Sequence, residues 1–166
     1  SRIYAFKVPS GEPELLTPGA LTDGAFFPSV SGDGNRVVFI SNDPLLVTSD
    51  QSQVFLIERP ANTIRILSTD VNGNPGNGLS TRASISHDGK WAVFPSKATN
   101  LKGAEIPAGS PDLFHIFLLN IETGEHKLVS ANSNGTLGNG DSFASELSED
   151  GNEVVFYTEA NNLIAT

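Results

Sequence analysis

Residues 83–96 read Ala-Ser-Ile-Ser-His-Asp-Gly-Lys-Trp-Ala-Val-Phe-Pro-Ser, and two variants of this stretch flank it along the chain. The variants, at residues 28–41 and 145–158, share Ser-x-Asp-Gly, then two residues, then an apolar trio that ends in Phe. Asp-Gly between two β-rich runs is typical of a hairpin, because tight turns need positive φ and glycine adopts it without steric cost. Each copy therefore predicts a two-stranded hairpin.

A second kind of hairpin alternates with the first. It fills sixteen positions in each of three copies, at residues 2–17, 53–68 and 115–130. In the later copies, turns at residues 60–62 and 122–124 separate an apolar run from a more polar one. The chain is therefore an internal repeat of two hairpin types, and its length varies between hairpins rather than within them.

The middle strands of this repeat predict the architecture. They are nearly continuous apolar runs, as in strands buried on both faces, and they lie at residues 37–40, 54–57, 116–119 and 154–157. Such sheets must be sandwiched between neighbouring sheets, and four-stranded antiparallel units stacked radially make a β-propeller. The prediction is an all-β fold with about three blades' worth of chain. Two whole blades and two complementary half-blades lie at residues 28–68, 83–130, 1–18 and 144–166.

Several motifs recur in order and resemble a known repeat. They are Ser-x-Asp-Gly-x-x-Val-x-Phe-x-Ser, then Ala-Thr-Asn-Leu, then Phe-Leu-Leu-Asn-Ile-Glu-Thr-Gly-Glu, and finally Gly-Asn-Gly-x-Ser. This set resembles the TolB-type, WD-repeat-like β-propeller repeats of secreted and periplasmic bacterial proteins, over nearly the whole chain. The resemblance implies a propeller and a periplasmic or secreted location, but a fold analogy says little about activity.

Composition excludes several classes of function. The net charge is −9 and the ten Lys and Arg residues are scattered singly, so no basic stripe is present to bind nucleic acid or an anionic membrane surface. No apolar run approaches the roughly 18 residues that membrane insertion needs. There is no Cys, which excludes disulfides, thiolate metal sites and a Cys nucleophile.

The two ends of the repeat predict open sheet edges. The strands at residues 3–6 and 154–157 would each leave an unpaired apolar edge. Either two copies pair in trans as a homodimer that closes a six-bladed ring with C2 symmetry, or additional blades from a longer parent chain cover the edges. The chain starts at Ser1 and contains no Met, which favours the second alternative.

Acidic residues recur at the hairpin turns and open one further loop. The Asp-Gly pairs are interpreted as structural turn residues, in which Asp caps its own backbone: Asp33, Gly34, Asp88, Gly89, Asp150 and Gly151. Asp70, Asn72 and Asn74 have the oxygen spacing that opens a calcium loop, but Pro75 and Thr81 stand where Gly and a bidentate Glu are needed. A plain turn is favoured there, with calcium as a weak alternative and no other cofactor or metal expected.

No catalytic constellation is visible in the chain. There is no Gly-x-Ser-x-Gly elbow and no His-x-x-x-His spacing, so we do not expect an enzyme. His126 is expected on a solvated outer strand, whereas His87 and His115 are candidates for a channel mouth. The connectors after the Asp-Gly hairpins differ most and carry exposed apolar candidates. The predicted ligand-binding residues are therefore Leu45, Leu46, His87, Ile106 and His115.

Two functions remain open from the sequence. The first is a non-catalytic propeller scaffold that binds a protein, a peptide or a cell-envelope ligand, as the resemblance implies. The alternative is the propeller domain or fragment of a secreted hydrolase, either a prolyl-oligopeptidase-like peptidase or a carbohydrate-active enzyme, whose catalytic part lies outside this chain.

Overall fold

The computed structural model describes residues 1–9, 11–19 and 21–164, and within them the regular structure consists of strands, without a helix. No described segment is therefore a helix long and apolar enough to cross a membrane. The strands are β1 (Tyr4–Ala5), β2 (Glu14–Leu15), β3 (Phe26–Val30), β4 (Arg36–Ser41), β5 (Gln53–Glu58), β6 (Thr63–Ile66), β7 (Ser84–Ile85), β8 (Trp91–Ser96), β9 (His115–Asn120), β10 (His126–Leu128), β11 (Ser142–Leu147) and β12 (Val154–Thr158).

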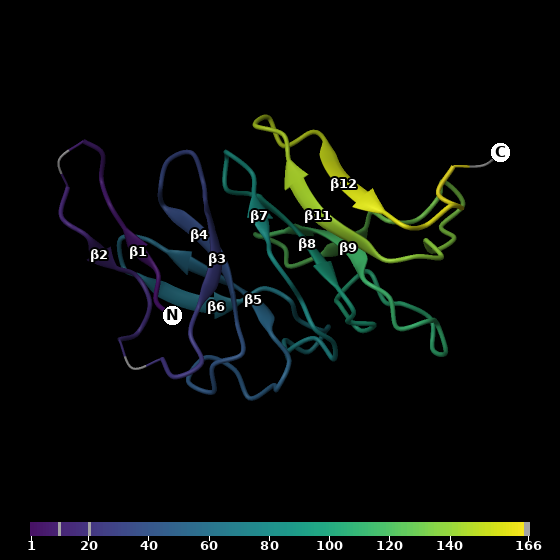
Figure 1. Cartoon of the computed structure of the whole chain (residues 1–166), viewed down its shortest axis with the longest axis horizontal. Coiled ribbons are helices and arrows are strands. Elements are labelled where there is room, and N and C mark those ends of the chain that lie inside the picture. Colours follow the sequence, from purple (N-terminus) through teal and green to yellow (C-terminus); the bar gives the residue numbers. More distant parts are fainter. Residues whose placement is uncertain (10, 20, 165–166) are drawn as a thin grey trace.

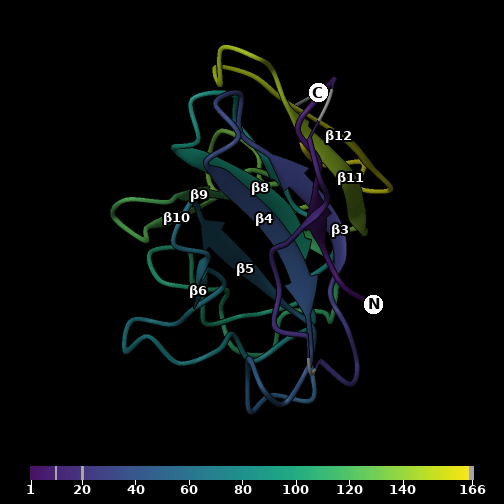
Figure 2. The same cartoon turned by 90° about the vertical axis from the view of Figure 1, so that its left-hand side faces the viewer.

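These strands form four antiparallel sheets whose strand order follows the chain. Two sheets have four strands, β3-β4-β5-β6 and β7-β8-β9-β10, and two have only two strands, β1-β2 and β11-β12. Figure 1 shows the sheets side by side in a row, with the two-stranded sheets at opposite ends. Figure 2 looks along this row and shows β4 in front of β8, so successive sheets stack face to face.

The three Asp-Gly turns have one geometry. In the first, Gly34 has a φ of 74°, and the flanking strands meet where Ser31 N donates to Arg36 O. Asp33 is not among the described residues with positive φ. Its carboxylate accepts hydrogen bonds from Ser31 Oγ at 2.7 Å and from Asn35 N at 2.9 Å. The turn is thus a four-residue loop rather than the tightest hairpin turn, because only glycine takes the left-handed conformation and Asp caps the turn before it.

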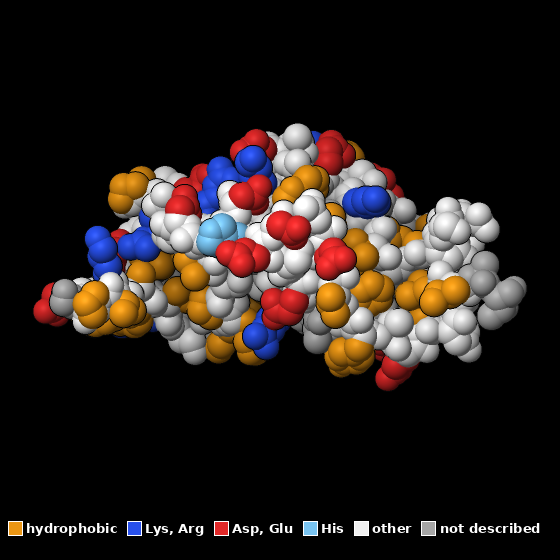
Figure 3. All heavy atoms as spheres, turned by 90° about the horizontal axis from the view of Figure 1, so that it is seen from above, with side chains coloured by type: hydrophobic (Ala, Val, Ile, Leu, Met, Phe, Trp, Pro, Cys, Tyr) orange, Lys and Arg blue, Asp and Glu red, His pale blue; other side chains and the backbone are white. Residues whose placement is uncertain are grey.

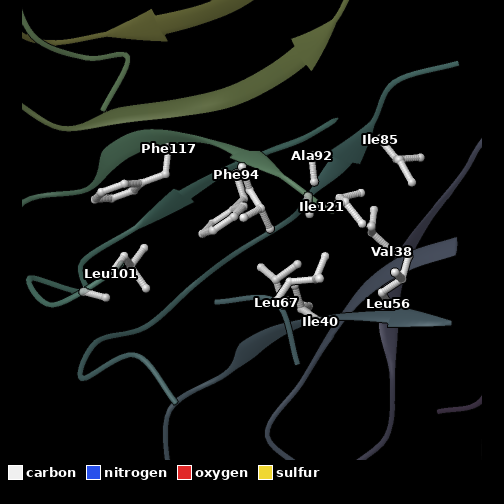
Figure 4. Packing of buried hydrophobic residues seen from close by; sticks show 14 of the residues in the cluster. Val38, Ile40, Leu56, Leu67, Ile85, Ala92, Phe94, Leu101, Phe117 and Ile121 are labelled. Carbon is white, nitrogen blue, oxygen red and sulfur yellow. The ribbon is translucent and has the colours of Figure 1, made fainter. Parts of the chain in front are cut away.

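Strands β4, β5, β8 and β9 are buried on both faces, as their apolar runs predict. The same prediction for residues 154–157 is wrong, because one face of β12 has no neighbouring sheet and leaves Val155 and Tyr157 70% and 58% exposed. In β4, Val37 and Phe39 belong to one core cluster, which they share with residues from the β1-β2 side. Their neighbours Val38 and Ile40 belong to a second cluster between the two four-stranded sheets, shown in Figure 4. Because side chains alternate along a strand, β4 contributes to both core clusters, one on each face of its sheet.

Two sets of interlocked asparagine contacts join the connector that enters a sheet, β6–β7 or β10–β11, to the segment that follows that sheet's second strand, β8 or β12. The side chain of Asn77 donates to Thr99 Oγ1 and accepts from Thr99 N, while Asn77 N donates to Asn100 Oδ1, all at 2.8–2.9 Å. One repeat later, Asn139 makes the same contacts with Asn161 and Asn162. We call each set an asparagine clasp. It explains why the Gly-Asn-Gly and Ala-Thr-Asn-Leu motifs recur together.

Candidate binding surface

The connector after β4 carries two of the predicted ligand-binding residues. Leu45 is 60% exposed and Leu46 is partly buried against the core below. Asp43, itself fully buried, accepts hydrogen bonds from Thr22 N at 2.6 Å and from Asp23 N at 2.8 Å. This carboxylate holds the connector against the segment that leads into β3, and it keeps Leu45 at the surface.

The equivalent connector after β8 behaves differently from the prediction. Ile106 is only 7% exposed and belongs to the core between the four-stranded sheets. Its backbone N donates to Thr99 O at 2.9 Å, so the connector folds back over the sheet. The expectation that Ile106 is an exposed contact is therefore wrong, because the longer connector has enough chain to cover its own apolar side chain.

Two of the three histidines lie inside the protein. His115 is buried, with its Nδ1 3.3 Å from Ser130 Oγ, so it does not line an open channel mouth. His126, expected at a solvated face, is also buried; its ring stands at 90° to Phe94 with centroids 5.9 Å apart. Burial lowers the pKa of both His115 and His126, because a charged imidazolium would lose its hydration.

His87 is the exposed histidine, and it lies where the three Asp-Gly turns meet. Its backbone O accepts from Gly32 N at 2.8 Å, and its Nδ1 lies 4.0 Å from Glu149 Oε1. Arg36 links the first two of these turns by donating from Nη1 to Gly89 O at 2.8 Å. Figure 3 looks onto this end of the molecule and shows acidic side chains gathered around a histidine. The turns thus form one charged surface around His87, on which acidic side chains lie beside the basic side chains of Arg36 and Lys90.

The loop that begins at Asp70, considered for calcium, is held by hydrogen bonds between its own residues. Asp70 Oδ1 accepts from Asn72 N at 2.8 Å and from Asn74 N at 2.9 Å, and Asn74 Nδ2 lies 3.2 Å from Asp70 Oδ2. In the next repeat, Asn132 Oδ1 accepts from the backbone in the same way without a charge. The carboxylate of Asp70 is therefore used as a turn cap. Among the described residues, no three His, Asp or Glu side chains gather in a way that could hold a metal ion.

An exposed aromatic pair, which the repeat pattern does not predict, lies at the start of β3. Phe26 and Phe27 are 40% and 55% exposed, with ring centroids 6.4 Å apart. Phe27 has a φ of 52°, which is rare and strained for a bulky side chain. A register shift between Phe26 and Ser29 bends the strand at this point. Comparing the repeats could have pointed to Phe27. The equivalent position in the next copy is Arg82, so the repeat itself does not call for an aromatic residue there.

The aromatic pair and Leu45 lie at the same end of their sheet. Phe26 is paired with Ile40, near the end of β4, and the connector that carries Leu45 follows directly. We call Phe26, Phe27 and Leu45 the apolar rim. The other predicted residues do not join it: His87 lies among the turns at the opposite end of the sheets, while Ile106 and His115 are buried.

A hollow of about 660 Å³ lies beside β1. Tyr4, Phe6, Val30 and Val37 contribute apolar surface to it, and Arg59 lies at its edge. Arg59 Nη2 donates to Glu14 Oε2 at 2.5 Å and Asn62 Nδ2 donates to Glu14 Oε1 at 2.9 Å. Strand β1 has a neighbour on one side only, so the hollow opens along an unpaired strand edge.

Comparison with known proteins supports the fold. TolB from Acinetobacter baumannii matches 96% of this chain with a TM-score of 0.58 and 13% identity, over 32% of its own chain. A protein described as a TolB from Agrobacterium tumefaciens matches 99% of this chain with a TM-score of 0.64 and 16% identity, over 48% of its own chain. No protein-family model and no curated protein matches. The chain therefore has a TolB-like all-β fold and spans about a third to a half of those two proteins.

Proposed function

We propose that the four-stranded sheets are blades of a β-propeller and that the protein is a non-catalytic scaffold that binds a protein or peptide in a secreted or periplasmic setting. The TolB-like fold and the resemblance of the repeats support this proposal. The observation that carries it is the strained, exposed Phe27 beside Phe26. Backbone strain survives at sites where function maintains it, and exposed aromatic residues are frequent anchors of binding interfaces.

The apolar rim determines the class of ligand. Phe26, Phe27 and Leu45 offer three apolar side chains at one end of a rigid sheet. Strand β3 is also the edge of its sheet. Its second half lies against β7, where Ile85 N donates to Ser29 Oγ, so the half that carries Phe26 and Phe27 can accept an extended segment alongside. The net charge of −9 disfavours strongly acidic partners. The ligand is therefore an extended peptide segment with apolar side chains.

The test uses the variant Phe27→Asn, which separates binding from folding. Asparagine tolerates a left-handed φ better than phenylalanine, so the variant should be as stable as the wild type or gain up to about 1 kcal/mol. A random peptide library displayed on phage is selected on the wild-type protein, and enriched peptides are synthesised. Their affinity by fluorescence anisotropy should fall at least about tenfold in Phe27→Asn, as expected on loss of an aromatic anchor.

Val71→Ser is the matched control, because Val71 is 63% exposed in a turn outside the apolar rim. Enriched peptides should bind this variant as they bind the wild type. Peptides that bind Phe27→Asn with unchanged affinity would contradict the proposal. A clear loss of stability in that variant would instead assign Phe27 a role in packing.

A further inference from the structure

Strands β1 and β12 each have one free edge, and the two edges belong to complementary halves of the repeat. In this chain β1 pairs only with β2, and β12 pairs only with β11. They lie at opposite ends of the row of sheets (Figure 1), so they do not meet within one copy. In the complete sheets, the strands equivalent to β12 and β1 are neighbours, as β4 and β5 are. Each edge therefore lacks the kind of strand that the other supplies.

The repeat predicts how β12 and β1 would align. In the complete sheets, Val38 lies opposite Leu56 and Val93 opposite Leu118. Val155 occupies the Val38 position of its hairpin, and Ala5 occupies the Leu56 position. The same register therefore places Val155 opposite Ala5.

Charge complementarity supports this register. Two residues before Val155, Glu153 falls opposite Lys7, and both side chains are exposed. The equivalent pair in the first complete sheet is Arg36 and Glu58, whose charged groups lie 3.7 Å apart. In the first complete sheet the cation, Arg36, lies on the strand equivalent to β12, whereas in the predicted pair the anion, Glu153, lies on the β12 side, directly before that strand. Each pair nevertheless joins one cation to one anion. Opposite charges directly across a strand pair stabilise that register, whereas like charges destabilise it.

The apolar faces of the two ends also match. Val38 and Ile40 pack with Ala92 and Phe94 of the next sheet in one core cluster. Val155 and Tyr157 occupy the positions of Val38 and Ile40 but are 70% and 58% exposed. In the predicted register they would face Val37 and Phe39, the counterparts of Ala92 and Phe94.

The hollow beside β1 is where this contact would form. Val37 lines it, together with Val30 and the side chains of Tyr4 and Phe6. Val37 and Phe39 are already buried on that face of the sheet, whereas Val30 remains 58% exposed. The hollow corresponds to the place that β11 and β12 would take.

We propose that two copies of this chain associate through β12 of each copy and β1 of the other. The pairings create two composite four-stranded sheets, which with two complete sheets from each copy make a ring of six.

The first experiment measures mass and register together. Sedimentation equilibrium of the 17.5 kDa chain at micromolar concentration should give twice that mass. The protein has no native Cys, so the double variant Ala5→Cys, Val155→Cys should form a covalent dimer on mild oxidation. The control pair Ala5→Cys, Glu153→Cys is diagonal in the predicted register, at about 7–8 Å, and should not cross-link efficiently.

The second experiment reverses the charges. Lys7→Glu places two carboxylates opposite each other at both contacts of the dimer and should weaken dimerisation about tenfold or more. Adding Glu153→Lys to the same chain should restore the wild-type dissociation constant, a rescue that a merely structural effect on the monomer would not produce. Circular dichroism checks that each variant retains its β structure.

Three results would overturn the proposal. They are a folded wild-type monomer at tens of micromolar, open oligomers larger than a dimer, and cross-linking that favours the diagonal pair. Open oligomers would mean that the contacts between copies do not close into a ring, and diagonal cross-linking would indicate another register for these edges. None of them bears on the apolar rim, whose peptide binding is measured separately.

Discussion

The Asp33 carboxyl has its pKa lowered to about 2 by hydrogen bonds, first from Asn35 N and then from Ser31 Oγ. Hydrogen bonds also lower the pKa of Asp88 and Asp150, with the Ser86 and Ser148 hydroxyls as the largest causes. A carboxylate that ionises more readily when folded stabilises the fold above its unfolded pKa. That contribution is lost as the pH falls through the folded pKa.

The thermal unfolding temperature should therefore decrease between about pH 4 and pH 2. In the triple variant Asp33→Asn, Asp88→Asn, Asp150→Asn, the turn caps keep an acceptor oxygen but cannot ionise, so this decrease should be smaller. Scanning calorimetry across the pH range makes the comparison. Asp50→Asn, at an exposed connector position, should keep the wild-type profile; an equal change there would show that net charge rather than turn capping is responsible.

A second pH dependence belongs to the buried histidines. The pKa of His126 is lowered by burial despite its backbone hydrogen bond with Lys102, so the unfolded chain binds a proton more readily than the folded one. Stability should therefore decrease as the pH falls below about 6.5. His126→Phe should flatten the unfolding profile in that window, measured by urea denaturation. An unchanged slope would assign the effect to His115 or to another group.

The positions of these residues show what sequence can and cannot predict. The Asp-Gly pairs were recognisable because the turn chemistry is local. His126 and Ile106 were misplaced because their burial depends on contacts between sheets and on how a long connector folds back. Phe27 was missed because its conformation arises from a strand irregularity that hydrophobic periodicity does not contain.

At the scale of elements, the asparagine clasps depend on two close backbone approaches. A Cβ added at Gly78 would lie 2.5 Å from Ala98 N, and one at Gly140 would lie 2.6 Å from the carbonyl carbon of Glu159. Both neighbours are backbone atoms and cannot rotate away. These glycines are thus required by the contact between the connectors, and not by turn conformation.

Gly78→Ala should therefore destabilise the protein by about 2 kcal/mol or more, the usual scale for overpacking at a rigid site. Urea unfolding followed by fluorescence of Trp91 would measure it. Gly19→Ala is the control, because its nearest side-chain atom would lie at an ordinary 3.8 Å. Equal free energies of unfolding for the two variants would mean that the connectors can move apart without a loss of stability.

The sequence predicted the positions of the central strands better than it predicted the conformations of the connectors. The apolar runs at residues 37–40 and 54–57 lie inside β4 and β5, because strands buried on both faces leave a strong signal. Strands β1, β2 and β7 contain only two residues each. Their short length depends on backbone hydrogen-bond geometry, which the residue types in these stretches do not determine.

At the scale of the whole molecule, protection against hydrogen exchange should be uneven. Strands β4, β5, β8 and β9 have neighbours on both sides, whereas β1 and β12 each have one free edge. Exchange measured by mass spectrometry should be slow in the first group at every concentration. In β1 and β12 it should slow as the concentration rises, if the edges pair between copies. Concentration-independent exchange in β12 would contradict that pairing.

The two asparagine clasps lie one repeat apart, and each joins only adjacent connectors. Residues 77–138 are one repeat and contain one whole clasp, that of Asn77 with Thr99 and Asn100, and the second clasp begins directly after them at Asn139. An in-frame duplication of that stretch would add a unit whose junctions already fit, since the array interacts only with its nearest neighbours. Longer or shorter arrays can thus be designed from this chain by adding or removing whole units, with the unit boundaries placed at the asparagine clasps.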